Sequence, residues 1–266
     1  MQSVGIAGFG NMGESMGVRI HQAFPDIAIY LIEPNAERAE RGRKICNGIL
    51  CDSFAGLIER SDVCIIAVKP PYVDDLLSEV DLEERASSKR YITIVAGKPI
   101  SVFSKRLRTH QVVRFMPNLA ATVGKALVGV CYESTVEDGF REEAMRIANT
   151  IGTPIVLPER LMAAVTGLSG SGIGYVLTFL HAMALGGTRA GIPYPDSLRI
   201  AGETIRGAVD LVEETGVNPI ELLTRITSAA GTTIEGLAAL EDSDFTSATM
   251  NAVFAASNRA KELEEA

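Results

Sequence analysis

The amino-acid sequence predicts an α/β fold in which an N-terminal parallel-sheet domain is followed by an all-helical domain. Two observations predict it. In the first half, short β-branched runs alternate with segments of helical length, which is typical of strands joined by crossover helices. From about Pro158 onward these runs end, and long segments rich in Ala, Leu and Gly replace them. We therefore expect two domains, residues 1–157 and 158–266.

Length and composition agree with this division. A chain of 266 residues corresponds to about two domains at roughly 150 residues each. The chain is 47% hydrophobic and 22% charged, as in soluble globular proteins. The 25 Lys and Arg against 33 Asp and Glu give a net charge of −8 and no basic tract. This excludes nucleic acid or an anionic membrane as the main partner, while a small anionic substrate remains compatible.

Location and metal content are predicted from what the sequence contains. No basic leader precedes the first strand-like run, so we expect a cytoplasmic protein. The longest apolar run, 173–185, is interrupted by Thr178 and His181 and is too short to span a bilayer. The 4 cysteines form no CxxC pair, and the 3 histidines form no HExxH. We therefore expect no metal site and no disulfide framework.

The elements of the first domain follow from the β-branched runs. A helix is expected before the last strand, over residues 137–150, and helical crossovers fill the earlier gaps. The predicted strands are 4–7, 28–32, 63–68, 91–95, 111–115, 126–132 and 153–157.

The second domain is predicted to be helical throughout. Such apolar helices would leave much hydrophobic surface on a lone domain, which indicates a core buried in a homodimer or a higher homo-oligomer. The predicted helices are 161–190, 195–215, 219–227, 233–240 and 245–264.

A GxGxxG loop lies between the first predicted strand and the next helix, which is the context that a dinucleotide-binding Rossmann-type fold requires. Its first glycine permits the tight turn, its second lets a pyrophosphate approach, and its third permits close helix packing. The alternative is a glycine-rich turn without a ligand. The candidate cofactor residues of this loop are Gly8, Phe9, Gly10, Asn11, Met12 and Gly13.

Glu33 ends the second predicted strand, where an acid accepts a hydrogen bond from the adenosine ribose 2′-hydroxyl. A carboxylate there would repel a 2′-phosphate, so the sequence predicts NADH in preference to NADPH. Arg38, Arg41 or Arg43 nearby could soften this preference. The alternative is that Glu33 is a solvated charge at a strand end.

Two later turns are predicted as further walls of the cofactor site, because ligands of open α/β sheets bind at the carboxyl ends of the strands. Lys69 alone is more often a solvated loop lysine. The turns are Ala67, Val68, Lys69 and Pro70, and Val95, Ala96 and Gly97.

The helical half contains two segments of small residues. Residues 165–172 (VTGLSGSG) open a long apolar helix, and residues 227–234 lead into another helix. The amides of Gly231, Thr232 and Thr233 would form a carboxylate cradle at that helix N-terminus. The alternative is an ordinary cap, with Thr232 as N-cap and Glu235 three residues later.

With these motifs, nearly the whole chain resembles the pyrroline-5-carboxylate reductases, which reduce a cyclic imino acid to L-proline. The matching motifs are GxGNMG (8–13), AVKP (67–70), AG (96–97), MPN (116–118), VTGLSGSG (165–172), GTTI (231–234) and NAV…R…EL (251–263).

The resemblance implies an NAD(P)H-dependent oxidoreductase acting on a CH–NH group in the last step of proline biosynthesis. It implies that Thr232 and Thr233, with Ser228 nearby, are the catalytic residues. It also implies that Gly231, Thr232 and Thr233, together with Ser171 and Gly172, bind the substrate, and that a homodimer is the minimal active unit.

The chain departs from the family pattern around the expected substrate pocket. These departures keep two alternatives open, namely a reductase of another cyclic imino acid, such as a piperideine carboxylate, and a non-catalytic cofactor-binding regulatory dimer. The substituted positions are Ile173 and Gly174 for Pro-Ala, Ala229 and Ala230 for Pro-Gly, Leu119 and Ala120 for Thr-Pro, and Asp244, Phe245 and Thr246 for Gly-Phe-Arg.

The reaction class also follows from chemistry. A protonated imine is already electrophilic, so the protein mainly orients the hydride donor and acceptor. The related β-hydroxyacid dehydrogenases carry a lysine four residues after the last glycine of a GxxGxG pattern, and here Val176 occupies that place after Gly172. Oxidation of an alcohol needs an acid or base at its oxygen, which valine does not supply. Val176 therefore favours an imine reductase.

Overall fold

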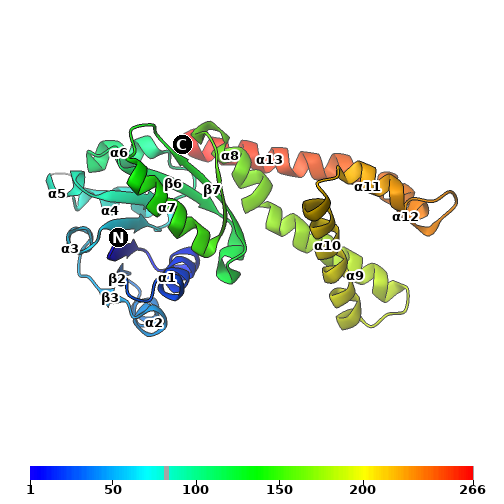
Figure 1. Cartoon of the computed structure of the whole chain (residues 1–266), viewed down its shortest axis with the longest axis horizontal. Helices are drawn as coiled ribbons and strands as arrows, with labels where there is room; N and C mark the ends of the chain where they lie inside the picture. Colours follow the sequence, from blue (N-terminus) through cyan, green and yellow to red (C-terminus); the bar gives the residue numbers. More distant parts are fainter. Residues whose placement is uncertain (81–83, 266) are drawn as a thin grey trace. The chain divides into compact units, whose positions relative to one another are not determined.

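The computed structural model describes residues 1–80 and 84–265 and consists of two compact units. Unit 1 comprises Met1–Ser171 and the residues from Ala255 onward, and unit 2 comprises Gly172–Phe254 (Figure 1). Met162 and Val165, which follow the predicted boundary at residue 157, are buried in the core of unit 1. The domain division at residue 157 stays a prediction.

Unit 1 is built on an eight-stranded sheet with the order β3-β2-β1-β4-β5-β6-β7-β8, so the α/β Rossmann-type prediction is confirmed. The pairing of β6 with β7 is antiparallel and the other pairings are parallel, because only a 3-10 turn, Leu119–Val123, joins these two strands. The strands are β1 Ser3–Ala7, β2 Ala28–Ile32, β3 Ile49–Leu50, β4 Val63–Ile66, β5 Arg90–Thr93, β6 Val112–Pro117, β7 Ala126–Tyr132 and β8 Gly152–Val156.

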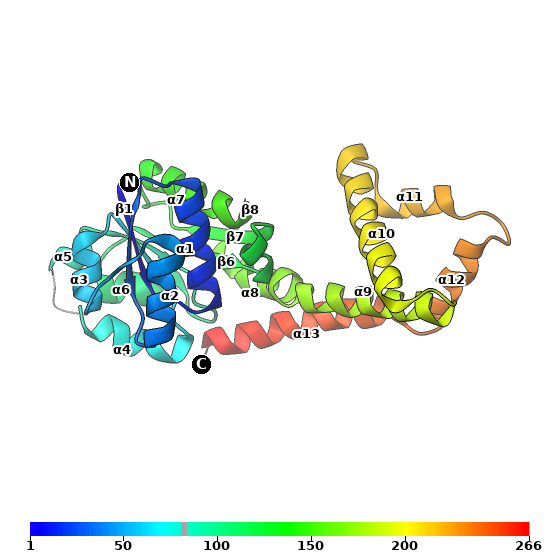
Figure 2. The ribbon, with the colours of Figure 1, turned by 90° about the horizontal axis from the view of Figure 1, so that it is seen from below.

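Helices cover both faces of this sheet (Figure 2). One hydrophobic cluster packs α1, α2 and α7 against the strands, and the other packs α3, α4, α5, α6 and α8. Alternate strand residues belong to opposite clusters, as Ile65 and Ile66 do. The helices are α1 Asn11–Ala23, α2 Ala36–Cys46, α3 Phe54–Arg60, α4 Val73–Ser78, α5 Glu84–Ser87, α6 Ile100–Leu107, α7 Asp138–Ile151 and α8 Met162–Val165.

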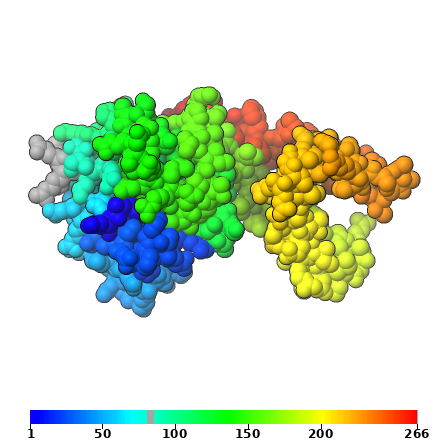
Figure 3. Space-filling model, in the orientation of Figure 1, coloured from blue at the N-terminus to red at the C-terminus, as the bar shows by residue number. Residues whose placement is uncertain are grey.

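Unit 2 is helical, as predicted, but it has almost no core of its own. Within residues 172–254, all of which the structure describes, only Ala184, Ser197 and Ala201 are buried. Large apolar side chains such as Ile220 and Met250 are exposed, and the space-filling view shows an opening among the helices (Figure 3). The helices are α9 Gly172–Arg189, α10 Tyr194–Thr215, α11 Pro219–Ile226, α12 Thr232–Glu241 and the first turns of α13 Phe245–Glu265.

The apolar run 173–185 is part of a longer helical stretch. By length and composition alone, Glu159–Arg189 is long and apolar enough to cross a membrane, although the run 173–185 by itself is not. The longer stretch arises because short helical turns precede α9 directly. An exposed apolar helix of this kind is also suited to a subunit interface.

Candidate functional site

The glycine loop joins β1 to α1 and leaves room for an anion. Gly8 has a φ of +92°, and a Cβ there would lie 2.9 Å from the Ala67 carbonyl oxygen. At Gly13 a Cβ would lie 2.1 Å from the Gly8 carbonyl oxygen. A Cβ at Gly10, the N-cap of α1, would meet nothing within 4 Å. Two glycines therefore shape the loop, and the third leaves the helix N-terminus open to a pyrophosphate.

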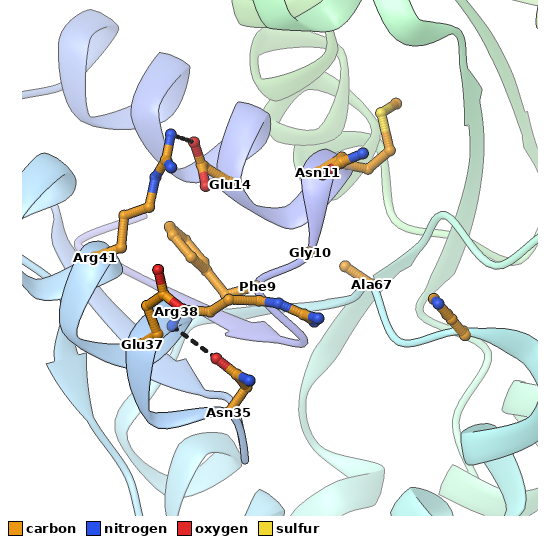
Figure 4. A pocket seen from close by; sticks show the side chains of 11 residues that line it. Phe9, Gly10, Asn11, Glu14, Asn35, Glu37, Arg38, Arg41 and Ala67 are labelled. Carbon is orange, nitrogen blue, oxygen red and sulfur yellow. Dashed lines mark hydrogen bonds and ion pairs between the residues drawn. The ribbon is translucent and has the colours of Figure 1, made fainter.

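A pocket of about 590 Å³ opens beside this loop (Figure 4). Six of the predicted cofactor residues line it, namely Phe9, Gly10, Asn11, Met12, Ala67 and Lys69. Five further residues complete the lining: Glu14, Asn35, Glu37, Arg38 and Arg41.

Glu33 contacts the backbone of the glycine loop and is not among the residues that line this pocket. Its Oε2 accepts a hydrogen bond from the Phe9 amide at 2.8 Å, and its Oε1 accepts one from the Asn35 amide at 3.0 Å. Only 5% of the side chain is exposed. The carboxylate therefore links the loop to the β2–α2 turn, and the geometry does not support the NADH preference that the sequence predicts from it.

Two guanidinium groups reach the pocket from the first turns of α2. The Arg38 side chain is 51% exposed and extends along the pocket (Figure 4), and the Arg41 side chain is 61% exposed. Arg41 Nη2 contacts Glu14 Oε1 at 2.7 Å. Asn35 Oδ1 caps α2 by accepting from the Arg38 amide at 3.0 Å. From the sequence, these arginines are expected only to soften the cofactor preference, although an Asn cap followed by Arg at helical spacing signals a cationic helix face.

The other predicted walls do not line this pocket. Gly97 has a φ of +71°, and a Cβ there would lie 3.0 Å from the Leu263 carbonyl oxygen, so its glycine is explained by the close approach of α13. Val95 is buried. Cofactor contacts of Val68, Pro70, Val95, Ala96 and Gly97 stay predictions.

The predicted substrate cradle lies at the N-terminus of α12. Gly231 is the N-cap of this helix, which corrects the alternative in which Thr232 caps it. The Gly231 amide donates to the Ser228 carbonyl oxygen at 3.1 Å, and a Cβ at Gly231 would lie 2.3 Å from Ser228 Oγ. Ser228 thus contacts the N-cap of α12, which has no side chain, and Thr232 and Thr233 form the first turn of this helix.

Two family glycines are replaced in this unit by residues that keep a left-handed backbone. Ala230 has a φ of 55° and Asp244 a φ of 54°. Asp tolerates this region better than Ala does, because its short polar side chain can bond locally. Both positions therefore have a backbone conformation that glycine adopts without strain.

Replacing Ala230 by Gly is expected to stabilise the protein by about 1 kcal/mol, because it removes left-handed strain. Thermal unfolding should show a rise in Tm of roughly 2–4 °C. Ala229→Gly is the matched control, since Ala229 does not have a positive φ, and it should not raise Tm. An unchanged Tm in Ala230→Gly would contradict the strain at this turn.

A second pair of motifs meets at the carboxyl end of β6. Asn118 Nδ2 donates to Ser169 Oγ at 3.0 Å, and Asn118 Oδ1 accepts from the Ala120 amide at 3.1 Å. Ser169 lies in a π-turn, Thr166–Gly170, which ends where the Ser171 amide donates to the Thr166 carbonyl oxygen at 2.8 Å. The predicted substrate residues Ser171 and Gly172 follow directly. Sequence reasoning missed Asn118, although it identified its motif.

The cysteines are not candidates for nucleophilic catalysis. All are free, and burial raises the pKa of Cys46 to about 11 and that of Cys64 and Cys131 to about 12. Burial also raises the pKa of Cys51. Each thiol is therefore protonated at neutral pH, whereas the reactive form of cysteine is the thiolate.

The parallel sheet, the glycine loop and its pocket define a nicotinamide-dependent oxidoreductase with a Rossmann-type domain. Comparisons with known proteins agree. Residues 3–97 match a family described as NADP oxidoreductase coenzyme F420-dependent, and residues 159–263 match one described as pyrroline-5-carboxylate reductase dimerisation.

Whole-chain relatives give the family. A pyrroline-5-carboxylate reductase of Methanosarcina acetivorans is 41% identical over 79% of this chain and 77% of its own length. One from Synechocystis is 34% identical over 98% of this chain and 97% of its own. The crystal structure of Plasmodium falciparum pyrroline carboxylate reductase with NADP bound is 26% identical, with a TM-score of 0.88 over 98% of both chains. The chain therefore belongs to the pyrroline-5-carboxylate reductase family.

Proposed function

We propose that this protein reduces 1-pyrroline-5-carboxylate to L-proline with a reduced nicotinamide cofactor, the last step of proline biosynthesis. The observation that carries the proposal is the open start of α12, where a side-chain-free N-cap precedes two threonines. A helix N-terminus of this kind binds a carboxylate. Family membership over nearly the whole chain supports the same substrate class.

The chain's own residues act by positioning. The amides of Thr232 and Thr233 bind the substrate carboxylate, one of the two hydroxyl oxygens accepts a hydrogen bond from the N–H of the protonated imine, and Ser228 supports the loop. The glycine loop holds the cofactor pyrophosphate, and the bound cofactor supplies the hydride. The protonated imine accepts that hydride at carbon and becomes a secondary amine, so no general base is required.

For the cofactor, we propose that NADPH is used at least as well as NADH. Arg38 and Arg41 offer guanidinium groups at the pocket wall, where a 2′-phosphate needs them, whereas the Glu33 carboxylate is engaged with backbone amides. The NADP in the Plasmodium falciparum structure is in keeping with this proposal.

We further propose that the protein is a cytoplasmic homodimer or higher homo-oligomer that acts on a small anionic substrate. The match to a dimerisation family over residues 159–263 and the exposed apolar side chains of unit 2 support the assembly. Burying those side chains in a partner would provide the core that unit 2 lacks.

The proposed function is tested by following oxidation of NADPH and NADH with 1-pyrroline-5-carboxylate and, in parallel, with a six-membered piperideine carboxylate. The expected result is faster turnover of the five-membered imine. Preference for the larger ring would mean that Ile173, Gly174, Ala229 and Ala230 reshape the pocket. Cofactor binding without turnover of any imine would favour the regulatory dimer instead.

A further inference from the structure

Arg114 is a buried cation that the reaction described above does not use. It lies on β6, and it is the largest of the fully buried side chains, with 1% of the side chain exposed. Nη1 contacts Glu159 Oε1 at 3.2 Å, and Nη2 contacts Glu264 Oε1 at 2.5 Å. Burying a guanidinium is costly, and such a pair adds little net stability compared with apolar packing. Stability alone therefore does not explain why Arg114 pairs with these two carboxylates.

The two carboxylates lie on the two segments of unit 1 that lead to unit 2 and return from it. Glu159 starts the segment that leads from β8 to Ser171, after which unit 2 begins. Glu264 lies at the end of α13, which returns to unit 1 at Ala255. One side chain on the central sheet thus holds the outgoing and the returning segments.

The outgoing segment, residues 159–171, is held at two further points within unit 1. Glu159 Oε1 also accepts from the Ile100 amide at 2.7 Å, which joins it to the start of α6. At the end of the same strand that carries Arg114, Asn118 bonds Ser169 at 3.0 Å. Strand β6 and the residue that follows it therefore hold the outgoing segment at Glu159, near the start of the segment, and at Ser169, directly before Ser171 and Gly172.

We propose that Arg114 is a positioning residue that clamps both crossing segments to β6 and thereby sets where Ser171 and Gly172 meet the substrate. This inference rests on the proposed imine reduction for its kinetic consequence. The clamp itself is a property of unit 1 and has a separate readout. Arg114 acts through Glu159 and Glu264 and does not touch the reacting atoms.

Cys131 provides that separate readout. It is the partner of Arg114 in the β6–β7 register and is 1% exposed. Loosening Glu264 from Arg114 should admit an alkylating reagent to this thiol, which peptide mapping distinguishes from the other cysteines.

The test compares Arg114→Met and Arg114→Lys in the full-length protein, with Arg43→Met as matched control. Arg43 is an arginine of unit 1 whose exposed side chain pairs with Glu40 at 3.4 Å. For Arg114→Met we expect a rise of about tenfold or more in the KM for the imine, an unchanged Kd for NADPH and faster alkylation of Cys131. Arg114→Lys should give intermediate values, and Arg43→Met should match the wild type.

Glu264→Gln provides a milder variant if Arg114→Met does not fold, and it should raise the imine KM and speed alkylation of Cys131 while leaving the Kd for NADPH unchanged. The proposal is overturned if Cys131 remains protected in the clamp variants. It is also overturned if the imine KM stays at the wild-type value, or if activity and cofactor binding fall together with the folded fraction. If the wild type itself reduces no imine, the proposed function fails, and Cys131 alkylation alone decides whether the clamp exists.

Discussion

Replacing Arg38 and Arg41 together by Ser is expected to raise the KM for NADPH about a hundredfold and to leave the KM for NADH within about twofold. The two cofactors differ only in the 2′-phosphate, so loss of its two guanidinium partners affects NADPH alone. Arg41 also contacts Glu14 at 2.7 Å, so it must leave this carboxylate before it can bind the 2′-phosphate. Arg38 lies 3.8 Å from Glu33, a weaker contact, and should therefore contribute more than Arg41 to binding the 2′-phosphate.

Arg43→Ser is the matched control, because Arg43 lies on the same helix but pairs with Glu40 at 3.4 Å and does not line the pocket. Glu33→Gln provides the contrast. If Glu33 supports the loop through Phe9, this variant weakens binding of both cofactors alike. If Glu33→Gln instead improves the binding of NADPH alone, Glu33 has the ribose-binding role that the sequence predicts. An equal change for both cofactors in the arginine double variant would contradict the phosphate site.

Thr232→Val and Thr233→Val should each test the substrate cradle, and at least one should lower kcat/KM for the imine by about 10- to 100-fold. Valine matches threonine in shape but lacks the hydroxyl oxygen that accepts a hydrogen bond from the protonated imine. The Kd for NADPH should not change, because neither residue lines the dinucleotide pocket. Steady-state kinetics and fluorescence titration of the cofactor separate the two quantities.

Thr204→Val is the control for this pair. Thr204 lies on α10, and its hydroxyl donates to the Ile200 carbonyl oxygen at 2.9 Å, so its loss should leave kcat/KM within about twofold. If both cradle variants keep wild-type kinetics, the substrate carboxylate is bound elsewhere.

The fold was predictable because its signals are local. Strands β2 and β7 occupy the predicted ranges 28–32 and 126–132, because their Ile, Val and Tyr residues favour extended backbone and pack on the buried sheet. Strand β3 was missed because it has only two residues, both exposed. The π-turn Thr166–Gly170 was also missed, because it depends on how the segment packs against β6, where Asn118 bonds Ser169.

The candidate site was predictable where backbone geometry demands a residue type. Gly8 and Gly13 are required by close backbone approach, and such positions leave a visible motif. The role of Glu33 was not predictable in the same way, because a carboxylate at a strand end can face a ribose or a backbone amide equally well. Only the position of the Phe9 amide, 2.8 Å away, decides between them. The Arg114 clamp joins residues far apart in sequence, so no local pattern signals it.

Direct hydride transfer to the imine is tested by incubating the wild-type protein with 1-pyrroline-5-carboxylate and NADPH deuterated at the transferring position of the nicotinamide. Mass spectrometry of the product should find proline that carries one deuterium at the former imine carbon. Proline formation without deuterium at that carbon, or binding of NADPH with no proline formed, would contradict direct hydride transfer to the cyclic imine by this protein.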